Sequence, residues 1–473
     1  MLNLNAGIAR RLFRFDLAWL MLLAGLAVQP AWSDVVDQTY QPSPYVKITH
    51  PEWSRNAVIY ELNTRQFTPE GTFAAAAKQL PRLRELGVDI VWLMPVQEIG
   101  LKNRKGTLGS PYSIRDYLGV NPDLGDLASL KHFVQEAHQL GMYVILDWVA
   151  NHTAWDNSLV EQHPDWYSRN WKGEMHSPTW TDWSDVVTLD YSEPGLRKYM
   201  TDAMKYWVEE VGMDGFRCDV AGFVPLDFWE NLRRELDAIR PVFMLAEWDE
   251  RDLHARAFDM TYSWGFNDTL HRIAMGEADA ASLAGYYYRV TNTWPRDGMR
   301  MLFVSNHDKN AWDGTQFEMY GNALENSIVL SVVSEGMPLI YNGQEAGNPK
   351  RLAFFEKDPI EWREHPIGDL YRKLFALKKR NSALWNGAWG AAMEPVFNNA
   401  PQQVFSFIRA NDQDRVFAVF NFSAEPVEVA FQDSLYHGDW QAFTSGETES
   451  LDAATVLQME PWTYRLFSNE KNK

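Results

Sequence analysis

The hydrophobic pattern of this 473-residue chain changes character along its length. From residue 56 to about 384, short β-rich runs that end in polar residues alternate with runs that carry apolar residues at helical spacing. The predicted strands are Val58–Asn63, Ile90–Pro95, Tyr143–Trp148, Gly215–Val220, Val242–Glu247, Phe258–Tyr262, Met301–Asn306 and Leu339–Tyr341. The predicted helices are Thr72–Leu86 with a kink at Pro81, Leu127–Leu140, Leu196–Val211, Phe228–Ile239, Asn322–Val333 and Asp369–Lys379. Eight strands, each followed by a helix, predict an α/β fold of the (β/α)₈ barrel type.

A doubly wound open sheet is the structural alternative. That fold carries a glycine-rich phosphate turn after its first strand. The first predicted strand ends instead in Glu61-Leu62-Asn63-Thr64-Arg65, which contains no glycine. The sequence therefore favours the barrel.

Two segments interrupt or follow the barrel pattern. The connection from His152 to Leu189 is polar and rich in Trp, and a loop of that length predicts a small subdomain over the barrel mouth. After about residue 385, short alternating strands predict a C-terminal antiparallel β-sandwich: Val404–Arg409, Arg415–Asn421, Val427–Phe431 and Thr463–Phe467. The predicted plan is a barrel in two parts (34–151 and 190–384), an inserted subdomain B (152–189) and a β-sandwich domain (385–473), after an N-terminal segment (1–33).

The N-terminal segment has the order of a secretory signal peptide. Arg10, Arg11 and Arg14 precede the apolar run Leu17–Val28, and Ala31-Trp32-Ser33 then offers small residues for cleavage. The apolar run is about a dozen residues, short of the ~20 that span a bilayer, although an uncleaved anchor is the alternative. We expect a secreted or periplasmic protein with no membrane attachment in its mature form.

Charge and cysteine content exclude several classes of function. The formal net charge of −19 repels phosphate backbones, so we expect no nucleic-acid partner. The single cysteine, Cys218, excludes an intramolecular disulfide, and its strand-like surroundings predict a core residue. We expect the mature protein to act as a monomer.

Candidate chemistry collects at the ends of four predicted strands. Strand three ends in DWVANH (147–152), strand four in GFRCD (215–219), strand five in LAEW (245–248) and strand seven in FVSNHD (303–308). One such acid is usually a capping or ion-paired residue. A barrel has no structural reason to direct all of these acids and histidines at its carboxyl-terminal mouth, where barrel enzymes place their active sites.

Two of these acids suit glycoside hydrolysis, which needs one ionised and one protonated carboxyl group. Arg217 lies two residues before Asp219, so both side chains share a strand face and Arg217 favours an ionised Asp219. Glu247 lies between Ala246 and Trp248, which is consistent with a protonated acid. The pattern predicts Asp219 as nucleophile and Glu247 as general acid/base.

In order, strand context and spacing, the four segments resemble the signature motifs of the α-amylase superfamily of retaining glycoside hydrolases. Gly87–Pro95, Thr188–Asp190 and Gly336–Glu345 match as well, and the resemblance covers residues 55–380. It implies that Asp308 is the third catalytic carboxylate. It further implies that Tyr112, His152, Arg217 and His307 bind the sugar or the nucleophile, and that Asp147 and Asp116 support the site.

The resemblance also bears on metal binding. In many relatives a structural calcium ion ties the inserted subdomain to the barrel, and Asn151 and Asp190 match two of its oxygen ligands. No organic cofactor is implied. Gly222 and Phe223 stand where many α-amylases carry Lys and His, which weakens the expectation of a standard endo-acting site.

The sequence leaves three functions open. The first is a retaining hydrolase of α-1,4-glucosidic bonds in starch-like glucans or malto-oligosaccharides. The second is a transglycosylase or an exo-acting α-glucosidase of the same family, which shares the covalent intermediate. The third, an inactive carbohydrate-binding protein, is disfavoured because Asp219, Glu247 and Asp308 are all present.

Overall fold

The structure is a computed structural model that describes residues 40–470. The predicted signal peptide, residues 1–33, lies outside the described residues. Within residues 40–470, no helix is both long and apolar enough to cross a membrane.

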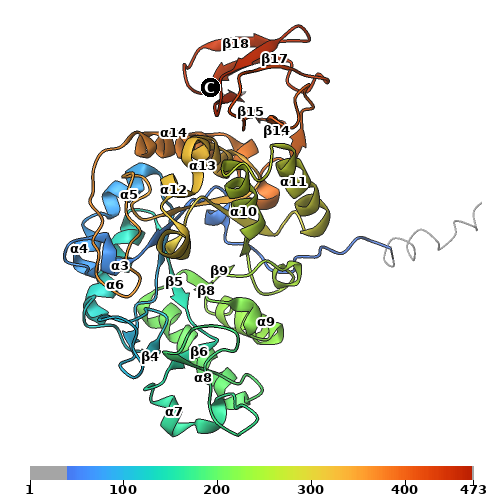
Figure 1. The fold of residues 1–473 in the computed structure, drawn as a ribbon. Coiled ribbons are helices and arrows are strands. Elements are labelled where there is room, and N and C mark those ends of the chain that lie inside the picture. The colour runs from blue at the N-terminus through green and yellow to red at the C-terminus, as the bar shows by residue number, and fades with distance from the viewer. Residues whose placement is uncertain (1–39, 471–473) are drawn as a thin grey trace, which may run out of the picture. The chain divides into compact units, whose positions relative to one another are not determined.

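Eight parallel strands close into one barrel (Figure 1). They are β1 (Ile59–Leu62), β2 (Ile90–Leu93), β5 (Tyr143–Trp148), β8 (Gly215–Cys218), β9 (Phe243–Ala246), β10 (Met260–Tyr262), β11 (Met299–Phe303) and β12 (Met337–Tyr341). Ile59 of β1 is in register with Ile90 of β2 on one side and Leu339 of β12 on the other, which closes the ring. The predicted (β/α)₈ fold is confirmed.

Helices surround these strands. They are α3 (Thr64–Phe67), α4 (Phe73–Ala77), α5 (Leu80–Leu86), α6 (Leu127–Gln139), α8 (Pro194–Tyr206), α9 (Leu226–Asp237), α10 (Trp264–Ala274), α11 (Ala281–Thr293), α12 (Gln316–Tyr320), α13 (Leu324–Val333) and α14 (Pro366–Arg380). Because helices cover the outside and side chains fill the inside, the strands are buried on both faces and read as continuous apolar runs. The interior is packed by Ile59, Trp92, Ile145, Phe243, Leu245, Met260, Met301, Phe303 and Leu339, among others.

Three details of the predicted barrel are wrong. The stretch Thr72–Leu86 forms two helices rather than one kinked helix, because Pro81 lacks the N–H that would continue the helix and stands in the first turn of α5 instead. The connection after β9 contains only the short 3₁₀ turn Arg251–His254 instead of an α-helix. Helices α10 and α11 stand where the pattern located none.

The insertion after the third barrel strand, β5, and the C-terminal β domain are both present. The insertion contains a two-stranded sheet, β6 (His152–Ala154) with β7 (Val186–Thr188), and the short helix α7 (Leu159–Gln162). The C-terminal domain pairs a six-stranded sheet with the two-stranded sheet β16–β19. Its strands are β13 (Met393–Pro395), β14 (Val404–Ala410), β15 (Asp414–Asn421), β16 (Val427–Ala430), β17 (Gly438–Ala442), β18 (Thr448–Leu451), β19 (Val456–Met459) and β20 (Tyr464–Glu470).

Buried polar contacts join the C-terminal domain to the barrel helices. Arg409 of β14 donates to the carbonyl oxygens of Ser334 at 2.7 Å and Ala391 at 3.0 Å. Asn326 of α13 donates to the carbonyl of Asn421 at 2.9 Å.

Candidate active site

Barrel geometry places the predicted acids at one end of the sheet. Asp219 and Glu247 directly follow β8 and β9, and their backbone amides continue the hydrogen bonding between neighbouring strands. The amide of Asp219 donates to the carbonyl of Trp148 at 2.9 Å, and that of Glu247 to the carbonyl of Cys218 at 3.0 Å. Both side chains therefore start from rigid backbone at the barrel mouth.

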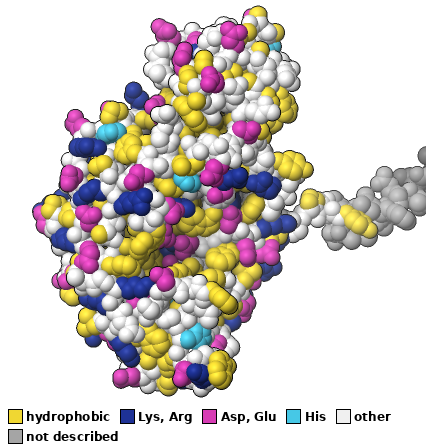
Figure 2. All heavy atoms as spheres, in the orientation of Figure 1, with side chains coloured by type: hydrophobic (Ala, Val, Ile, Leu, Met, Phe, Trp, Pro, Cys, Tyr) yellow, Lys and Arg dark blue, Asp and Glu magenta, His cyan; other side chains and the backbone are white. Residues whose placement is uncertain are grey.

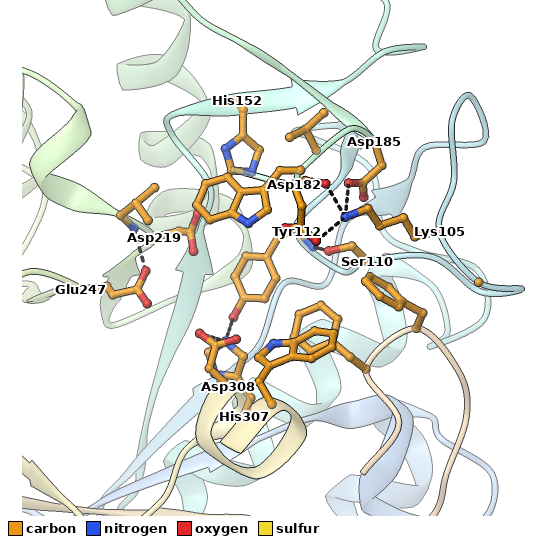
Figure 3. A pocket seen from close by; sticks show the side chains of 17 residues that line it. Lys105, Ser110, Tyr112, His152, Asp182, Asp185, Asp219, Glu247, His307 and Asp308 are labelled. Atoms are coloured by element: carbon orange, nitrogen blue, oxygen red, sulfur yellow. Dashed lines mark hydrogen bonds and ion pairs between the residues drawn. The ribbon is translucent and has the colours of Figure 1, made fainter. Parts of the chain in front are cut away.

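A cavity of about 780 Å³ opens at this mouth. Figure 2 shows acidic side chains inside a hollow bordered by hydrophobic ones, and Figure 3 shows the cavity from close by. Its lining includes Lys105, Ser110, Tyr112, His152, Asp182, Trp183, Asp185, Asp219, Glu247, His307, Asp308, Trp312, Phe354 and Phe355. Its volume is typical of small-molecule sites, which span roughly 300–1,000 Å³.

Arg217, which is fully buried, organises the carboxylates. Its Nη1 donates to Asp147 at 2.8 Å and to Asp219 at 3.0 Å. Its Nη2 lies 2.9 Å from Oε1 of Glu247 but lacks hydrogen-bond alignment. One guanidinium thus serves three buried carboxyl groups.

This excess of acids shifts their protonation. Burial and the charge of Glu247 raise the pKa of Asp219 well above its usual range, against the effect of Arg217. Burial also raises the pKa of Glu247, and Arg217 offsets this only in part. The expectation that Arg217 alone keeps Asp219 ionised is therefore incomplete, because Arg217 is shared. Like charges this close cannot all ionise, so the group retains a proton.

The turn that follows Asp219 is strained. Val220 has φ +36°, a left-handed conformation that is unusual for a β-branched residue. Such a residue costs roughly 1–3 kcal/mol and persists only where its surroundings enforce it. Here the turn points the Val220 amide at Glu247, to whose Oε2 it donates at 2.8 Å. The strained turn therefore supplies a hydrogen bond that orients the Glu247 carboxyl group.

Tyr112 and His307 form the floor of the cavity. Their rings stack at 5.3 Å, and Tyr112 Oη lies 2.8 Å from Nε2 of His307 and donates to Asp147 at 3.0 Å. On the other side of the imidazole, Nδ1 of His307 lies 2.5 Å from Glu61. Burial lowers the pKa of His307, but the charges of Asp308 and Glu61 raise it to about 9. The protonated ring thus has a partner for each N–H.

Glu61 was not among the predicted site residues. It is the third of the four residues of β1, one before the strand ends, and it is fully buried against His307. Its place near a strand end was the one available signal. Its partner His307 is 246 positions away in the sequence, so their contact could not be read from local spacing.

The remaining predicted site residues divide between the cavity and its surroundings. His152 and Asp308 line the cavity, and burial lowers the pKa of His152 to about 4, so its imidazole is neutral. Asp308 lies 3.5 Å from Nε2 of His307. Asp147 is buried beneath the cavity. Asp116 is exposed outside it and accepts from the backbone amide of Leu118 at 3.0 Å.

Within residues 40–470, the structure brings together the two predicted calcium ligands but no complete set of ligands. Asn151 and Asp190 are brought near each other, since the amide next to Asp190, that of Leu189, donates to the Asn151 carbonyl at 3.1 Å. The Asp190 carboxylate accepts from the Ser192 amide at 2.9 Å. Calcium takes six to eight oxygens, and residues 40–470 contain no group of three or more His, Cys, Asp or Glu side chains that could hold a metal ion. These side chains do not fit a calcium site by themselves, and calcium stays a prediction.

The unusual Gly222 has a steric reason. A Cβ atom at this position would lie 2.0 Å from the ring of Trp248, which follows Glu247. The ring of Phe223 meets Trp248 edge-on at 5.2 Å, and Phe223 is about half exposed. A lysine side chain therefore has no room at position 222, because the Trp248 ring, packed against Phe223, occupies that space.

Comparison with known proteins agrees with this architecture. Residues 52–382 match the family model of the α-amylase catalytic domain, and residues 396–461 match that of the α-amylase C-terminal all-beta domain. The chain is 29% identical over 399 residues to the α-amylase MalA of Haloarcula japonica, covering 80% of this chain and 57% of that protein's length. It is 25% identical to a cyclomaltodextrinase from a Bacillus species, over 78% of this chain and 73% of the relative.

A solved structure is similar along almost its whole length. The maltogenic α-amylase AmyB of Thermotoga neapolitana is 31% identical, with a TM-score of 0.76 over 88% of this chain and 97% of AmyB. Together with the match of the catalytic-domain model, this shows that the chain belongs to the α-amylase family of glycoside hydrolases.

Proposed function

We propose that this enzyme hydrolyses α-1,4-glucosidic bonds in starch-like glucans or malto-oligosaccharides with retention of anomeric configuration. The observation that carries the proposal is the sharing of one buried guanidinium, Arg217, among Asp147, Asp219 and Glu247. The group holds too many acids to be fully ionised. A retaining site needs this combination of an anionic nucleophile and a protonated acid.

The hydrogen bonds assign the two roles. Arg217 donates a charged hydrogen bond to Asp219, which favours the ionised form of that carboxyl group and opposes the rise that burial causes in its pKa, whereas the one aligned hydrogen bond to Glu247 comes from the uncharged Val220 amide. In the first step Asp219 attacks the anomeric carbon while Glu247 gives its proton to the departing glycosidic oxygen. In the second step Glu247 takes a proton from water, whose oxygen displaces Asp219 and restores the free enzyme.

The surrounding side chains hold the sugar whose bond is cleaved. The Tyr112 side chain, which stacks on His307, offers an apolar face to the sugar ring. Neutral His152 can hydrogen-bond sugar hydroxyl groups and Asp308 can accept from them, whereas His307, whose ring nitrogens face Glu61 and Tyr112, holds the Tyr112 ring in place. Hydrogen bonds to the sugar that shorten as the sugar ring flattens toward the oxocarbenium-like transition state contribute to the rate.

Retention and the identity of the nucleophile can be tested together. With maltotriose, proton NMR of the first product should show the α-anomer before mutarotation, whereas β-anomer would overturn retention. A fluorinated glucosyl fluoride that slows the second step should leave a glycosyl mass on the peptide that contains Asp219. In a sugar complex we expect the Asp219 and Glu247 carboxyl groups ~5–5.5 Å apart.

Transfer to a sugar acceptor is a second candidate activity. Phe223, which is about half exposed, packs edge-on against Trp248, the residue after Glu247, and lines a second, smaller hollow next in the chain to the nucleophile turn. Aromatic faces retain sugars in wet sites and favour an acceptor over water. Time-resolved product analysis with maltotriose at high concentration tests this: products longer than maltotriose support transfer, and their absence at all times argues against it.

A further inference from the structure

The loop between β3 (Glu98–Ile99) and β4 (Ile114–Asp116) crosses one end of the cavity. Arg104 braces it from within by donating to the carbonyl oxygens of Gly100 at 2.8 Å and Ile99 at 3.0 Å. A loop held by its own side chain in this way keeps one shape. Its next residue, Lys105, lines the cavity.

Lys105 ties the loop to the inserted segment. Its Nζ donates to the carbonyl of Asp182 at 2.7 Å and lies 3.9 Å from Oδ1 of Asp185. Asp185 is buried, so a nearby cation offsets the loss of solvent around its carboxylate. The dashed lines in Figure 3 mark this bridge.

The same loop is tied to the segment after β12 on its other side. The amide of Leu108 donates to the carbonyl of Phe355 at 3.1 Å, and the amide of Thr107 donates to Glu356 at 2.8 Å. Gly106 has φ +63°, and a Cβ there would lie 2.5 Å from Cβ of Phe355. Glycine therefore permits a backbone approach that no other residue allows.

These contacts form a continuous wall from the inserted segment to the loop after β12. In Figure 3 the wall, marked by Lys105 and Asp185, lies on the side of Tyr112 opposite Glu247. In the proposed mechanism Glu247 protonates the leaving oxygen, so the leaving part of the glucan extends past Glu247. The part that Asp219 retains extends toward Lys105.

From this placement, and resting on the proposed function, we infer that the Lys105 bridge closes the retained end of the cleft. The enzyme then removes short fragments from the non-reducing ends of malto-oligosaccharides and does not cut long chains internally. Lys105 and Asp185 are the residues that set this limit, and neither contacts the bond that is broken.

The test uses maltohexaose that carries a fluorescent label at its reducing end. In the first turnovers, wild-type enzyme should release unlabelled fragments of one short length, with the matching shortened labelled product. A spread of unlabelled fragments from the first turnovers, including maltotriose and longer, would overturn the inference while leaving the hydrolase function intact. No cleavage of any linear α-1,4-glucan would instead count against the proposed function.

Variants locate the effect in the bridge. Lys105→Ala and Asp185→Asn should each increase the share of longer unlabelled fragments about tenfold. A tenfold change is the lower end of what one contact in a binding pocket contributes to discrimination between substrates. Lys102→Ala is the matched control, because Lys102 lies in the same loop but is exposed and outside the cavity lining. If both bridge variants release fragments of the same lengths as wild type, the bridge does not set the limit. If a variant does not fold, the fragment profile of the wild-type enzyme still decides whether the enzyme acts at chain ends.

Discussion

Two buried arginines in this barrel serve opposite purposes. Arg233 of α9 donates to Asp259 at 2.8 Å, and Asp259 also accepts from the Met244 amide at 2.7 Å and lies 2.6 Å from His50 Nδ1. Although burial raises the pKa of Asp259, Arg233 and His50 hold it below its usual value. Arg217 at the mouth shares its charge among three acids, and the pKa of Asp219 rises.

The difference lies in the ratio of charges, because the arginine is buried at both sites and the carboxyl groups are buried as well, with Asp259 0% exposed, Asp219 7% and Glu247 9%. Where cations and donors match the acid, the carboxylate stays ionised and stabilises the fold. Where acids outnumber cations, a proton is retained and can be given to a substrate. The mouth is therefore less stable than it could be, as expected of a site arranged for reaction.

The largest effect should follow from removing the carboxylate that we propose as the nucleophile. Asp219→Asn should lower turnover of maltotriose on the order of 10⁴-fold, since the covalent route is lost. The same change removes one of the competing acids, so the melting temperature should stay equal or rise. Steady-state kinetics and thermal melts test both, and near-normal turnover would contradict the assignment.

The matching change at the other arginine should act on stability. Asp259→Asn leaves buried Arg233 with Asp237, which is partly exposed, as its one remaining carboxylate partner, and we expect a loss of about 3 kcal/mol in the free energy of unfolding, the lower end for a broken buried pair. Turnover per folded molecule should change little. Urea titration measures the loss. A variant as stable as wild type would show that the ion pair of Arg233 with Asp259 does not stabilise the fold.

The pH dependence of stability should report His307. Its pKa rises from 6.5 to about 9 on folding, so its contribution is fully present below pH 6.5 and is lost as pH rises through about 9. That contribution is on the order of 3 kcal/mol. Unfolding of wild type and of His307→Gln, compared at pH 6 and at roughly pH 10, should show a difference that shrinks with pH; a constant difference would count against a protonated His307.

The smallest effect should come from the histidine beside Asp259. His50→Gln should lower the free energy of unfolding at pH 6 by about 1.5 kcal/mol, the value of a hydrogen bond to a charged group. Burial lowers the pKa of His50, but Asp259 raises it above 6.5 overall. The stabilisation by His50 is therefore lost as pH rises through its raised pKa. The difference in unfolding free energy between wild type and His50→Gln should be smaller at pH 8 than at pH 6. Turnover should match wild type at both.

Strand ends were the most informative feature of the sequence. Continuous apolar runs that end in Asp219, Glu247 or the Asn306–Asp308 stretch predict both the barrel and its reactive mouth, because parallel strands bring their carboxyl ends together. Helices were located less well. In α10, Phe266, Leu270 and Ile273 repeat at helical spacing and are buried, a signal that was available and missed.

The sequence by itself determined the barrel, its insertion, the C-terminal β domain and the identity of the acids. These follow from local periodicity and from which residue types end each strand. Only the tertiary structure decided how many acids share Arg217, that Glu61 pairs with His307, that Val220 adopts a left-handed turn and that Lys105 donates to the Asp182 carbonyl in the inserted segment. Each depends on burial or on contacts between distant segments, and the energies of charges and strained turns are set by that packing rather than by neighbours in the chain.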